Sequence, residues 1–287
     1  MSVTIKKPKM ELFSNKKTNH FILDHMIELL LLLLIVVLSI VSPAFLTVNN
    51  VLNILRNVAM KGVIAYGMCL VILAGEIDLS VGSQVALCAV ITASISKWLA
   101  EAGIMPIELG AVVGLVVAIA VAIGMGFFHA WARQKFNMPT FIITLANLNI
   151  MYGLAAIICG GFPIVNSFPG WYVFTGVGKV FGIPFPALVF IAVFFLFWFI
   201  TEKTDLGRKI YAVGGNAEAA RLNGINVYRT RIFVMCAVQV MCVLGGMMNS
   251  AQVRSATFGF GRGWETQIIS SVVIGGTSML GGIGTIW

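Results

Sequence analysis

The stretch GEIDLSVGS at residues 75–83 places two carboxylates, Glu76 and Asp78, between apolar runs at 51–74 and 85–95. Both runs are apolar enough to lie in lipid. A charge at the centre of a bilayer helix costs roughly 2.5–3.5 kcal/mol on insertion scales, so acidic residues in such a chain usually lie at an interface, in a cavity or in a functional site. The stretch therefore predicts a sharp connection between two membrane-spanning helices.

The composition of the whole chain is that of a membrane protein. Of its 287 residues, 59% are hydrophobic and 10% are charged, and the mean hydropathy is +0.97. A soluble domain carries about 25% charged residues. The net charge of +8 does not indicate nucleic-acid binding, because the basic residues are neither gathered in one soluble domain nor interleaved with aromatic side chains.

Hydropathy predicts an all-α polytopic membrane helix bundle, in which each span has about 20 mostly apolar residues. The eight candidate spans lie near 26–46, 51–74, 80–98, 107–128, 138–160, 184–201, 230–252 and 266–287. Residues 1–25 form a basic tail, and residues 26–287 form the transmembrane domain. The lysine-rich tail followed by the first apolar run also resembles a secretory signal, but the later runs favour a retained first span.

The positions of lysine and arginine predict the orientation of the spans. If the basic tail lies in the cytoplasm, the basic connections 129–137 and 202–229 also lie there, whereas 99–106 and 161–183 lie outside. The basic residues that depart from this pattern are Lys179, Arg254 and Arg262. The outer segment 161–183 is rich in glycine, proline and aromatic residues, which predicts irregular backbone at the membrane interface.

Two of the spans carry patterned faces. In the fourth, small residues recur every four positions, which lets a neighbouring helix approach closely and predicts an interior helix. These residues are Gly110, Gly114, Ala118, Ala122 and Gly126. In the fifth, Thr140, Thr144 and Asn147 share one face. That polar face fits either hydrogen bonding between helices or the lining of a substrate path.

The longest connection, 202–229, contains GGNAEAARLNGI at 214–225. This pattern predicts a very short helix with both ends specified. Its signals are a turn at Gly214 and Gly215, a cap at Asn216, an anion at Glu218 in the first turn, a cation at Arg221 near the other end, and a stop at Asn223 and Gly224. A helix of one or two turns is not stable alone in water, so a partner is expected to dock on it.

No motif for catalysis or for nucleotide binding is present. The chain has no GxxxxGK[ST] phosphate loop, no HExxH, no GxSxG and no Cys/His constellation that would hold a metal. All five cysteines lie inside apolar runs and are interpreted as core residues. His129, close to Arg133, is expected at the membrane interface. The chain is therefore not expected to be an enzyme or to bind a cofactor itself, and any nucleotide-driven work must come from a partner.

Four motifs together resemble the permease subunits of bacterial ABC importers for ribose, xylose, galactose and related sugars. They are GEIDLSVGS at 75–83, NMPTFIITL at 137–145, GRKIYAVGGNAEAARLNGI at 207–225 and GRGWETQIISSVVIGGTSMLGGIGTI at 261–286. The resemblance extends over nearly the whole chain. Two positions differ from the family pattern: Glu76 stands where glycine is frequent, and Thr266 stands where a hydrophobic residue is usual.

The resemblance implies a type II-importer-like fold in the inner membrane and a set of partners. These are a second permease copy, identical or not, two cytoplasmic ATPase subunits that bind ATP and Mg²⁺, and an extracytoplasmic sugar-binding protein. It also implies that the short helix is the coupling helix seated in the ATPase, through Asn216, Ala217, Glu218, Ala219, Ala220, Arg221, Asn223, Gly224 and Ile225. Permeases of the broader class have ten spans, so the family pattern is expected to continue beyond Trp287.

The predicted topology places 75–83 at the cytoplasmic ends of the second and third spans. Asp78 can then stabilise the start of the third helix near Ser80, or line an inner gate. Glu76 is expected to be interfacial and solvated. The candidate residues of the substrate path are Asp78, Ser80, Thr140, Thr144 and Asn147, with Gln267, Ser270 and Ser271 opposite them.

Two alternatives remain open from the sequence. An ion-coupled secondary carrier would place ionisable residues at mid-membrane, but the acidic residues here lie near the ends of spans. An ABC permease for an autoinducer or a branched-chain amino acid would share the coupling and packing motifs.

Overall fold

The computed structural model describes residues 26–287 and divides into two units, one ending at Asn53 and the other comprising Ile54–Trp287. The predicted basic tail, residues 1–25, lies outside the described residues.

In the first unit, α2 spans Met26–Val41 and α3 begins at Val48. Helix α2 has 16 residues, fewer than the roughly 20 that cross a bilayer in a straight helix. The helix ends before Pro43, a residue that lacks a backbone donor and disfavours helical backbone at the residue before it. The helix at the predicted span 26–46 therefore ends at Val41, before the predicted end of the span.

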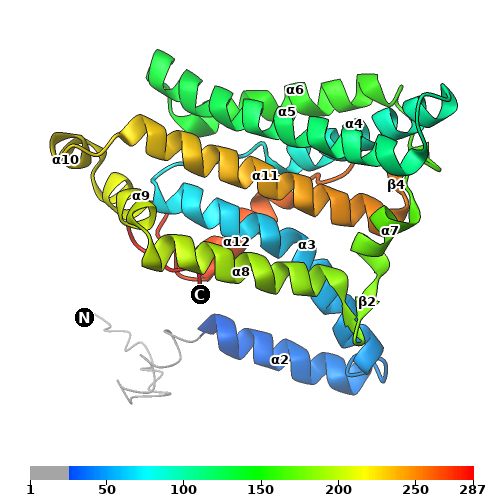
Figure 1. Ribbon diagram of the computed structural model, residues 1–287. Coiled ribbons are helices and arrows are strands. Elements are labelled where there is room, and N and C mark those ends of the chain that lie inside the picture. The colour runs from blue at the N-terminus through cyan, green and yellow to red at the C-terminus, as the bar shows by residue number, and fades with distance from the viewer. Residues whose placement is uncertain (1–25) are drawn as a thin grey trace, which may run out of the picture. The chain divides into compact units, whose positions relative to one another are not determined.

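The second unit is a helical bundle, as predicted (Figure 1). Counting α3, which begins in the first unit, six helices are long and apolar enough to cross a membrane: α3 (Val48–Leu73), α4 (Val81–Glu101), α5 (Ile107–Phe136), α6 (Thr140–Ile158), α8 (Phe185–Lys203) and α11 (Val227–Val253). The shorter helices are α7 (Gly170–Val177), α9 (Asp205–Gly215), α10 (Ala217–Leu222) and α12 (Trp264–Ile274).

Short strands pair at the ends of these helices. Strand β1 (Ile164–Val165) pairs antiparallel with β4 (Ser255–Ala256), and β2 (Lys179–Val180) pairs antiparallel with β3 (Ile183–Pro184). The segment 161–183 was predicted to be irregular, but it also contains α7, in which Tyr172 is fully buried and its hydroxyl group lies 2.9 Å from Ser250 Oγ. Burial of this aromatic ring explains an ordered helix in a segment rich in glycine and proline.

The predicted eighth span, 266–287, is wrong. Helix α12 has 11 residues and ends at Ile274, after which Gly276, Gly281, Gly282 and Gly284 have positive φ angles. L-residues with side chains rarely adopt this conformation, and a run of it cannot continue a helix. Hydropathy counted this glycine-rich segment as apolar, although its backbone folds back on the bundle, where the amide of Gly282 donates to the carbonyl of Leu73 (2.9 Å).

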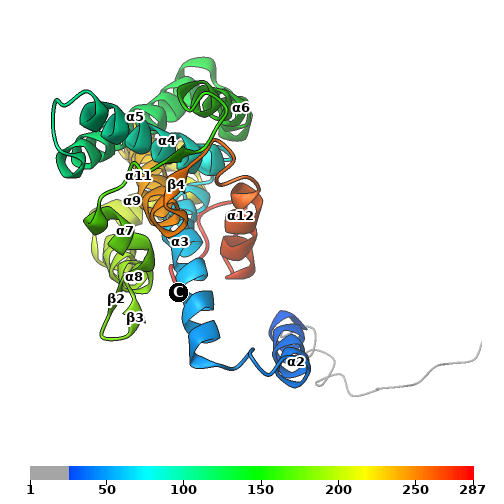
Figure 2. The ribbon, with the colours of Figure 1, turned by 90° about the vertical axis from the view of Figure 1, so that its right-hand side faces the viewer.

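Helices α4 and α11 contribute most to the interior of the bundle. Figure 2 shows them between α5 and α6 on one side and α3 and α8 on the other. The small-residue face of α5 is buried as expected, and it contacts both central helices. A Cβ added at Gly114 would lie 2.7 Å from the carbonyl oxygen of Thr92 in α4, and one at Gly126 would lie 2.6 Å from Cys236 Cα in α11.

The opposite face of α5 is exposed, with Val116 at 61% of its full accessibility. The expectation of an interior helix therefore holds for one face only. The small residues let the backbones of α4, α5 and α11 approach closely, and the large apolar residues on the far side of α5 suit lipid.

Two glycines of α5 give opposite predictions for the same substitution. Gly114→Ala should destabilise the folded protein by about 1–3 kcal/mol, because the added methyl group overlaps the backbone of α4. Gly124→Ala should leave stability unchanged or raise it by roughly 0.5–1 kcal/mol, since nothing lies within 4 Å of the new Cβ and alanine favours helix. Thermal unfolding in detergent measures both variants, and equal shifts would contradict the close packing of α4 on α5.

Candidate functional site

The predicted short helix between α9 and α11 is present as α10 (Ala217–Leu222). The side chain of Asn216 caps it by accepting from the amide of Ala219 (2.9 Å), and Asn223 Nδ2 donates to the carbonyl of Ala219 (2.8 Å). Gly224 follows with φ 81°, and the amide of Ile225 donates to the carbonyl of Ala220 (3.0 Å). Both ends of this six-residue helix are thus closed by its own residues.

The outer surface of α10 is suited to a protein partner. Arg221 and Glu218 form a two-pronged pair, with Nε 3.1 Å from Oε2 and Nη2 2.5 Å from Oε1. These hydrogen bonds from Arg221 lower the pKa of the Glu218 carboxyl below its usual value. Leu222, beside this pair, is 77% exposed. Leu222 was not among the predicted coupling residues, although its apolar side chain is exposed at the end of α10 and suits contact with a protein partner.

The turn predicted at Gly214 and Gly215 is wrong, because both residues belong to the last turn of α9 (Asp205–Gly215). Helix α9 is capped by the Thr204 hydroxyl group, which accepts from the amide of Gly207 (3.3 Å). A Cβ on Gly214 would overlap the carbonyl oxygen of Leu73 at the end of α3. Gly214 is therefore needed for the close contact between the backbones of α9 and α3, and it does not form a turn.

Three of the sequence motifs meet at this end of the bundle. Gly75 begins the 75–83 motif, Gly214 lies in the 207–225 motif, and Gly281 lies in the 261–286 motif. A Cβ on Gly281 would lie 2.8 Å from both Gly75 Cα and the carbonyl oxygen of Gly214. These segments, distant in the chain, approach closely through their glycine backbones, and the Tyr211 hydroxyl group also donates to the carbonyl of Gly284 (2.9 Å).

Glu76 is buried in this region, so the expectation that it is solvated is wrong. Its side chain is 5% exposed, and Oε1 lies 2.7 Å from Arg231 Nε of α11 and 3.4 Å from Arg133 Nε of α5. The hydroxyl group of Thr140, the first residue of α6, donates to Oε2. A carboxylate can be buried where cations and donors from three helices replace water.

Asp78 is fully buried and organises the start of α4. Its Oδ1 accepts from the backbone amide of Ser80 (2.8 Å) and from the Ser80 hydroxyl group (2.7 Å), and its Oδ2 accepts from Gln239 Nε2 (2.7 Å). Ser80 is the N-cap residue of α4. Asp78 thus holds the capping residue in place and joins it to α11.

The polar face of α6 faces the 76–79 segment and α5. Thr140 binds Glu76, the hydroxyl oxygen of Thr144 accepts from the amide of Leu79 (3.0 Å), and Asn147 Nδ2 lies 2.6 Å from His129 Nε2. His129 is fully buried, and its Nδ1 lies 3.8 Å from Asp78 Oδ2. His129 was expected at the membrane interface, but α5 turns this residue inward, toward α6 and the 75–83 segment.

A polar cavity of about 450 Å³ lies beside α10. Glu218 and Arg221 of α10, Gln134 of α5 and Arg231 of α11 contribute to its lining. Arg231 therefore lies between α10 and the buried Glu76, which connects the surface helix to the 75–83 segment through one side chain.

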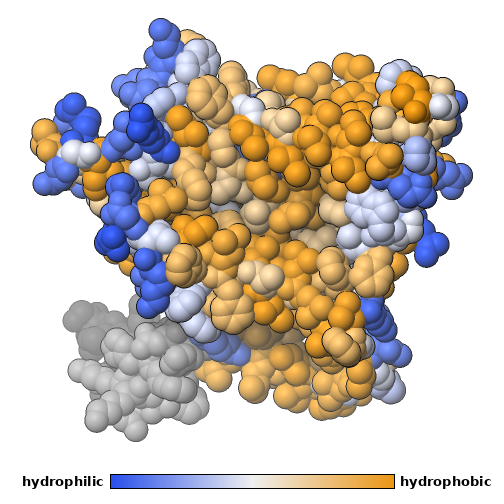
Figure 3. Space-filling view, viewed as in Figure 1, coloured by the Kyte–Doolittle hydropathy of each residue, from blue (hydrophilic) through white to orange (hydrophobic). Residues whose placement is uncertain are grey.

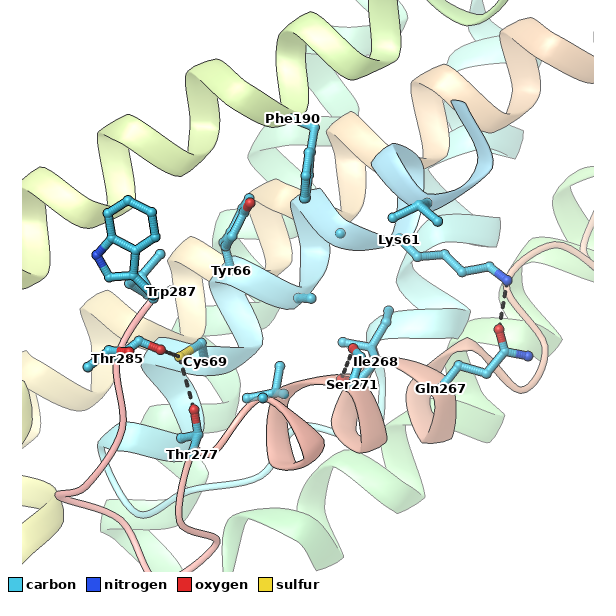
Figure 4. Close-up of a pocket in the computed structure, with 16 residues that line it drawn as sticks. Lys61, Tyr66, Cys69, Phe190, Gln267, Ile268, Ser271, Thr277, Thr285 and Trp287 are labelled. Atoms are coloured by element: carbon cyan, nitrogen blue, oxygen red, sulfur yellow. Dashed lines mark hydrogen bonds between the residues drawn. The ribbon is translucent and has the colours of Figure 1, made fainter. Parts of the chain in front are cut away.

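A second cavity, of about 460 Å³, lies between α3, α8, α12 and the C-terminal segment (Figure 4). Gln267 and Ser271 line it, whereas Ser270 is exposed and is not among its lining residues. Thr140, Thr144 and Asn147 do not line this cavity. The structure of this chain therefore does not bring the two predicted sets of path residues into one cavity.

Lys61, in α3, also lines this cavity, although it was not among the predicted path residues. Its Nζ lies 2.6 Å from Gln267 Oε1 (Figure 4). In the sequence, Lys61 is the single lysine in the apolar run 51–74, and a lysine at such a position indicates a polar environment. Within residues 26–287, no group of three or more His, Cys, Asp or Glu side chains could hold a metal ion.

Comparison with known proteins identifies similar chains. The family described as branched-chain amino acid transport system, permease component, matches residues 50–286. The ribose import permease protein RbsC of Escherichia coli (strain K12) is 36% identical over 275 residues, which cover 94% of this chain and 82% of that protein. RbsC of Bacillus subtilis (strain 168) is 35% identical over 258 residues, covering 89% of this chain and 77% of the relative.

A third relative is the galactose/methyl galactoside import permease protein MglC of Escherichia coli (strain K12). It is 32% identical over 272 residues, which cover 91% of this chain and 80% of the relative. No solved structure matches the chain.

The buried Glu76 gives a prediction about stability. Glu76→Gln should destabilise the protein by about 3–5 kcal/mol, because Arg231 and Arg133 would lose their buried counter-charge. Glu218→Gln, the same substitution in the exposed pair on α10, should leave the unfolding temperature almost unchanged. Thermal unfolding of the purified protein compares the two, and similar small shifts would show that the Glu76 cluster adds little to stability.

Proposed function

The chain belongs to the family of branched-chain amino acid transport system permease components, and on that premise we propose that it is the transmembrane subunit of an ABC importer for a monosaccharide. The family description alone would equally suit an amino acid. The similar proteins import ribose and galactose, according to their names, at 32–36% identity. A ribose-like or galactose-like sugar is therefore the preferred solute.

The observation that carries the proposal is α10, a six-residue helix with an exposed Leu222 and both ends closed, at one end of a bundle with six membrane-spanning helices. Such a helix fits a cleft on another protein, since it is too short to be stable without neighbours. We assign that cleft to a separate ATPase subunit, which binds ATP and Mg²⁺. The permease itself is then not an enzyme and binds no cofactor.

The charge distribution supports a cytoplasmic location for the α10 end. Arg208 and Arg221 are exposed there and Lys209 is half-buried, and the positive-inside rule places such residues on the cytoplasmic side. Figure 3 shows apolar side chains across the middle of one face and polar side chains toward both ends, as expected of a protein in a bilayer. The proposed orientation puts the N-terminal tail in the cytoplasm of a multi-pass inner-membrane protein.

The exposed face of α12 supports a polar path. Thr266, Gln267, Ser270 and Ser271 are exposed on this helix, whereas exposed positions along α5 and α8 are mostly large apolar residues such as Val116. Lipid does not solvate hydroxyl and amide groups. We therefore assign this face to the solute path and to contact with a second permease copy. An extracytoplasmic sugar-binding protein then delivers the solute to the end of the bundle opposite α10.

The proposal is tested by isolating the complex and measuring uptake. A tagged chain, solubilised gently from its native membrane, should co-purify with an ABC ATPase identified by mass spectrometry. Proteoliposomes containing that complex and its binding protein should accumulate radiolabelled D-ribose or D-galactose when ATP is supplied. Collapse of the proton gradient should leave uptake unchanged. Loss of uptake on that collapse, with no ATPase recovered, would favour an ion-coupled carrier.

A second prediction concerns Gly224, which ends α10 with φ 81°. Gly224→Val should uncouple ATP hydrolysis from uptake, because a β-branched residue is strained there by roughly 1–2 kcal/mol or more and would deform α10. Gly103→Val is the matched control, since Gly103 also has a positive φ (69°) but lies in the connection between α4 and α5. The expected result is normal ATPase binding with several-fold lower uptake for Gly224→Val alone. Equal uptake by the two variants would contradict a coupling role.

A further inference from the structure

Lys61 is an ionisable residue near the middle of a membrane-spanning helix. Helix α3 runs from Val48 to Leu73, so Lys61 lies about as far from one end as from the other. A lysine at this depth costs about 2.5–3.5 kcal/mol on insertion scales, and such residues face a bundle interior or a water-filled cavity. The position of Lys61 therefore needs a compensating environment.

The described part of the chain does not supply a counter-charge. Lys61 Nζ lies 2.6 Å from Gln267 Oε1 and 5.4 Å from the centroid of the Trp264 ring. No acidic side chain among residues 26–287 forms an ion pair with it. An ammonium group has three donors, and one amide oxygen satisfies only one of them. The remaining donors of Lys61 are thus available to water or to a ligand.

The cavity beside Lys61 combines an apolar wall with a few polar groups. Tyr66 and Phe190 stack with ring centroids 5.0 Å apart, and the ring of Trp287 also contributes to the wall (Figure 4). Ser271 and Gln267 add a hydroxyl and an amide group from α12. A volume of about 460 Å³, mostly apolar and with few polar side chains, is typical of a site for a small molecule.

We propose that this cavity is a solute-binding site at mid-membrane, in which Lys61 and Gln267 contact the transported solute. The ligand class is a hydroxyl-rich monosaccharide. The Lys61 ammonium and the Gln267 amide nitrogen donate to its oxygen atoms, and the aromatic wall covers its C–H face. This inference rests on the proposed importer function and makes Lys61 a residue that determines which solute passes.

The first experiment asks whether the cavity contains water, which does not require transport. In membrane vesicles, Lys61→Cys and Gln267→Cys should react with a charged, water-soluble methanethiosulfonate reagent, and labelled peptides identified by mass spectrometry separate these sites from the native cysteines. Val116→Cys, on the exposed apolar face of α5, is the matched control and should react far more slowly. Millimolar D-ribose or D-galactose, whichever is imported, should slow labelling at positions 61 and 267. Labelling of Lys61→Cys no faster than Val116→Cys would overturn the proposal.

The second experiment asks whether Lys61 contacts the solute. With the complete complex in proteoliposomes, Lys61→Met should raise the sugar concentration for half-maximal uptake about tenfold or more, because a hydrogen bond to a charged group is lost. Lys61→Arg should restore most of the affinity. Lys97→Met is the control, since Lys97 is partly exposed near the end of α4 and does not line this cavity.

The outcomes separate the inference from the function on which it rests. An assembled Lys61→Met complex with wild-type uptake kinetics would overturn the inference and leave the importer function intact. Absence of sugar uptake by the wild-type complex would overturn the importer function instead. If Lys61→Met does not assemble, protection of Gln267→Cys by the imported sugar decides the question, and absence of protection counts against the site.

Discussion

The burial of Glu76 between Arg231 and Arg133 is the interaction on which the α10 end of the bundle depends. A carboxylate in a membrane bundle is tolerated only where other groups replace its water, and here the replacing groups come from α5, α6 and α11. The three helices and the 75–83 segment must therefore keep one arrangement. Arg231 also lines the cavity beside α10, so one side chain belongs both to this cavity and to the buried charge cluster.

Close backbone contacts supply the rest of the framework. Gly114 and Gly126 bring α5 against α4 and α11, and Gly214 brings the end of α9 against the end of α3. These contacts leave no space for a side chain, so they define the distance between helices more tightly than large residues would. In lipid, where apolar surface gains little from contact with another helix, this packing is a main source of helix association.

The two candidate regions differ in the chemistry that they offer. The α10 end carries the charges, the cap and the exposed Leu222 that suit a protein partner, whereas the cavity beside α12 carries the hydrogen-bonding groups that suit a solute. Helix α3 belongs to both: Lys61 lines the cavity near its middle, and the carbonyl of Leu73 at its end accepts from Gly282. The C-terminal segment likewise lines the cavity through Thr285 and Trp287 and contacts the end of α3 through Gly282.

The sequence by itself determined the membrane class, the helical fold and the short capped helix α10, because hydropathy over about 20 residues and capping signals depend on neighbours along the chain. It also determined which face of α5 is small and which face of α6 is polar. Only the tertiary structure decided that Glu76 and His129 are buried, since their partners lie on helices far away in the sequence. For the same reason, the sequence could not show that residues 275–287 fold back as a glycine-rich segment, or that Lys61 meets Gln267 beside a cavity. Local patterns report propensity and polarity, whereas burial of a charge depends on which helices pack together.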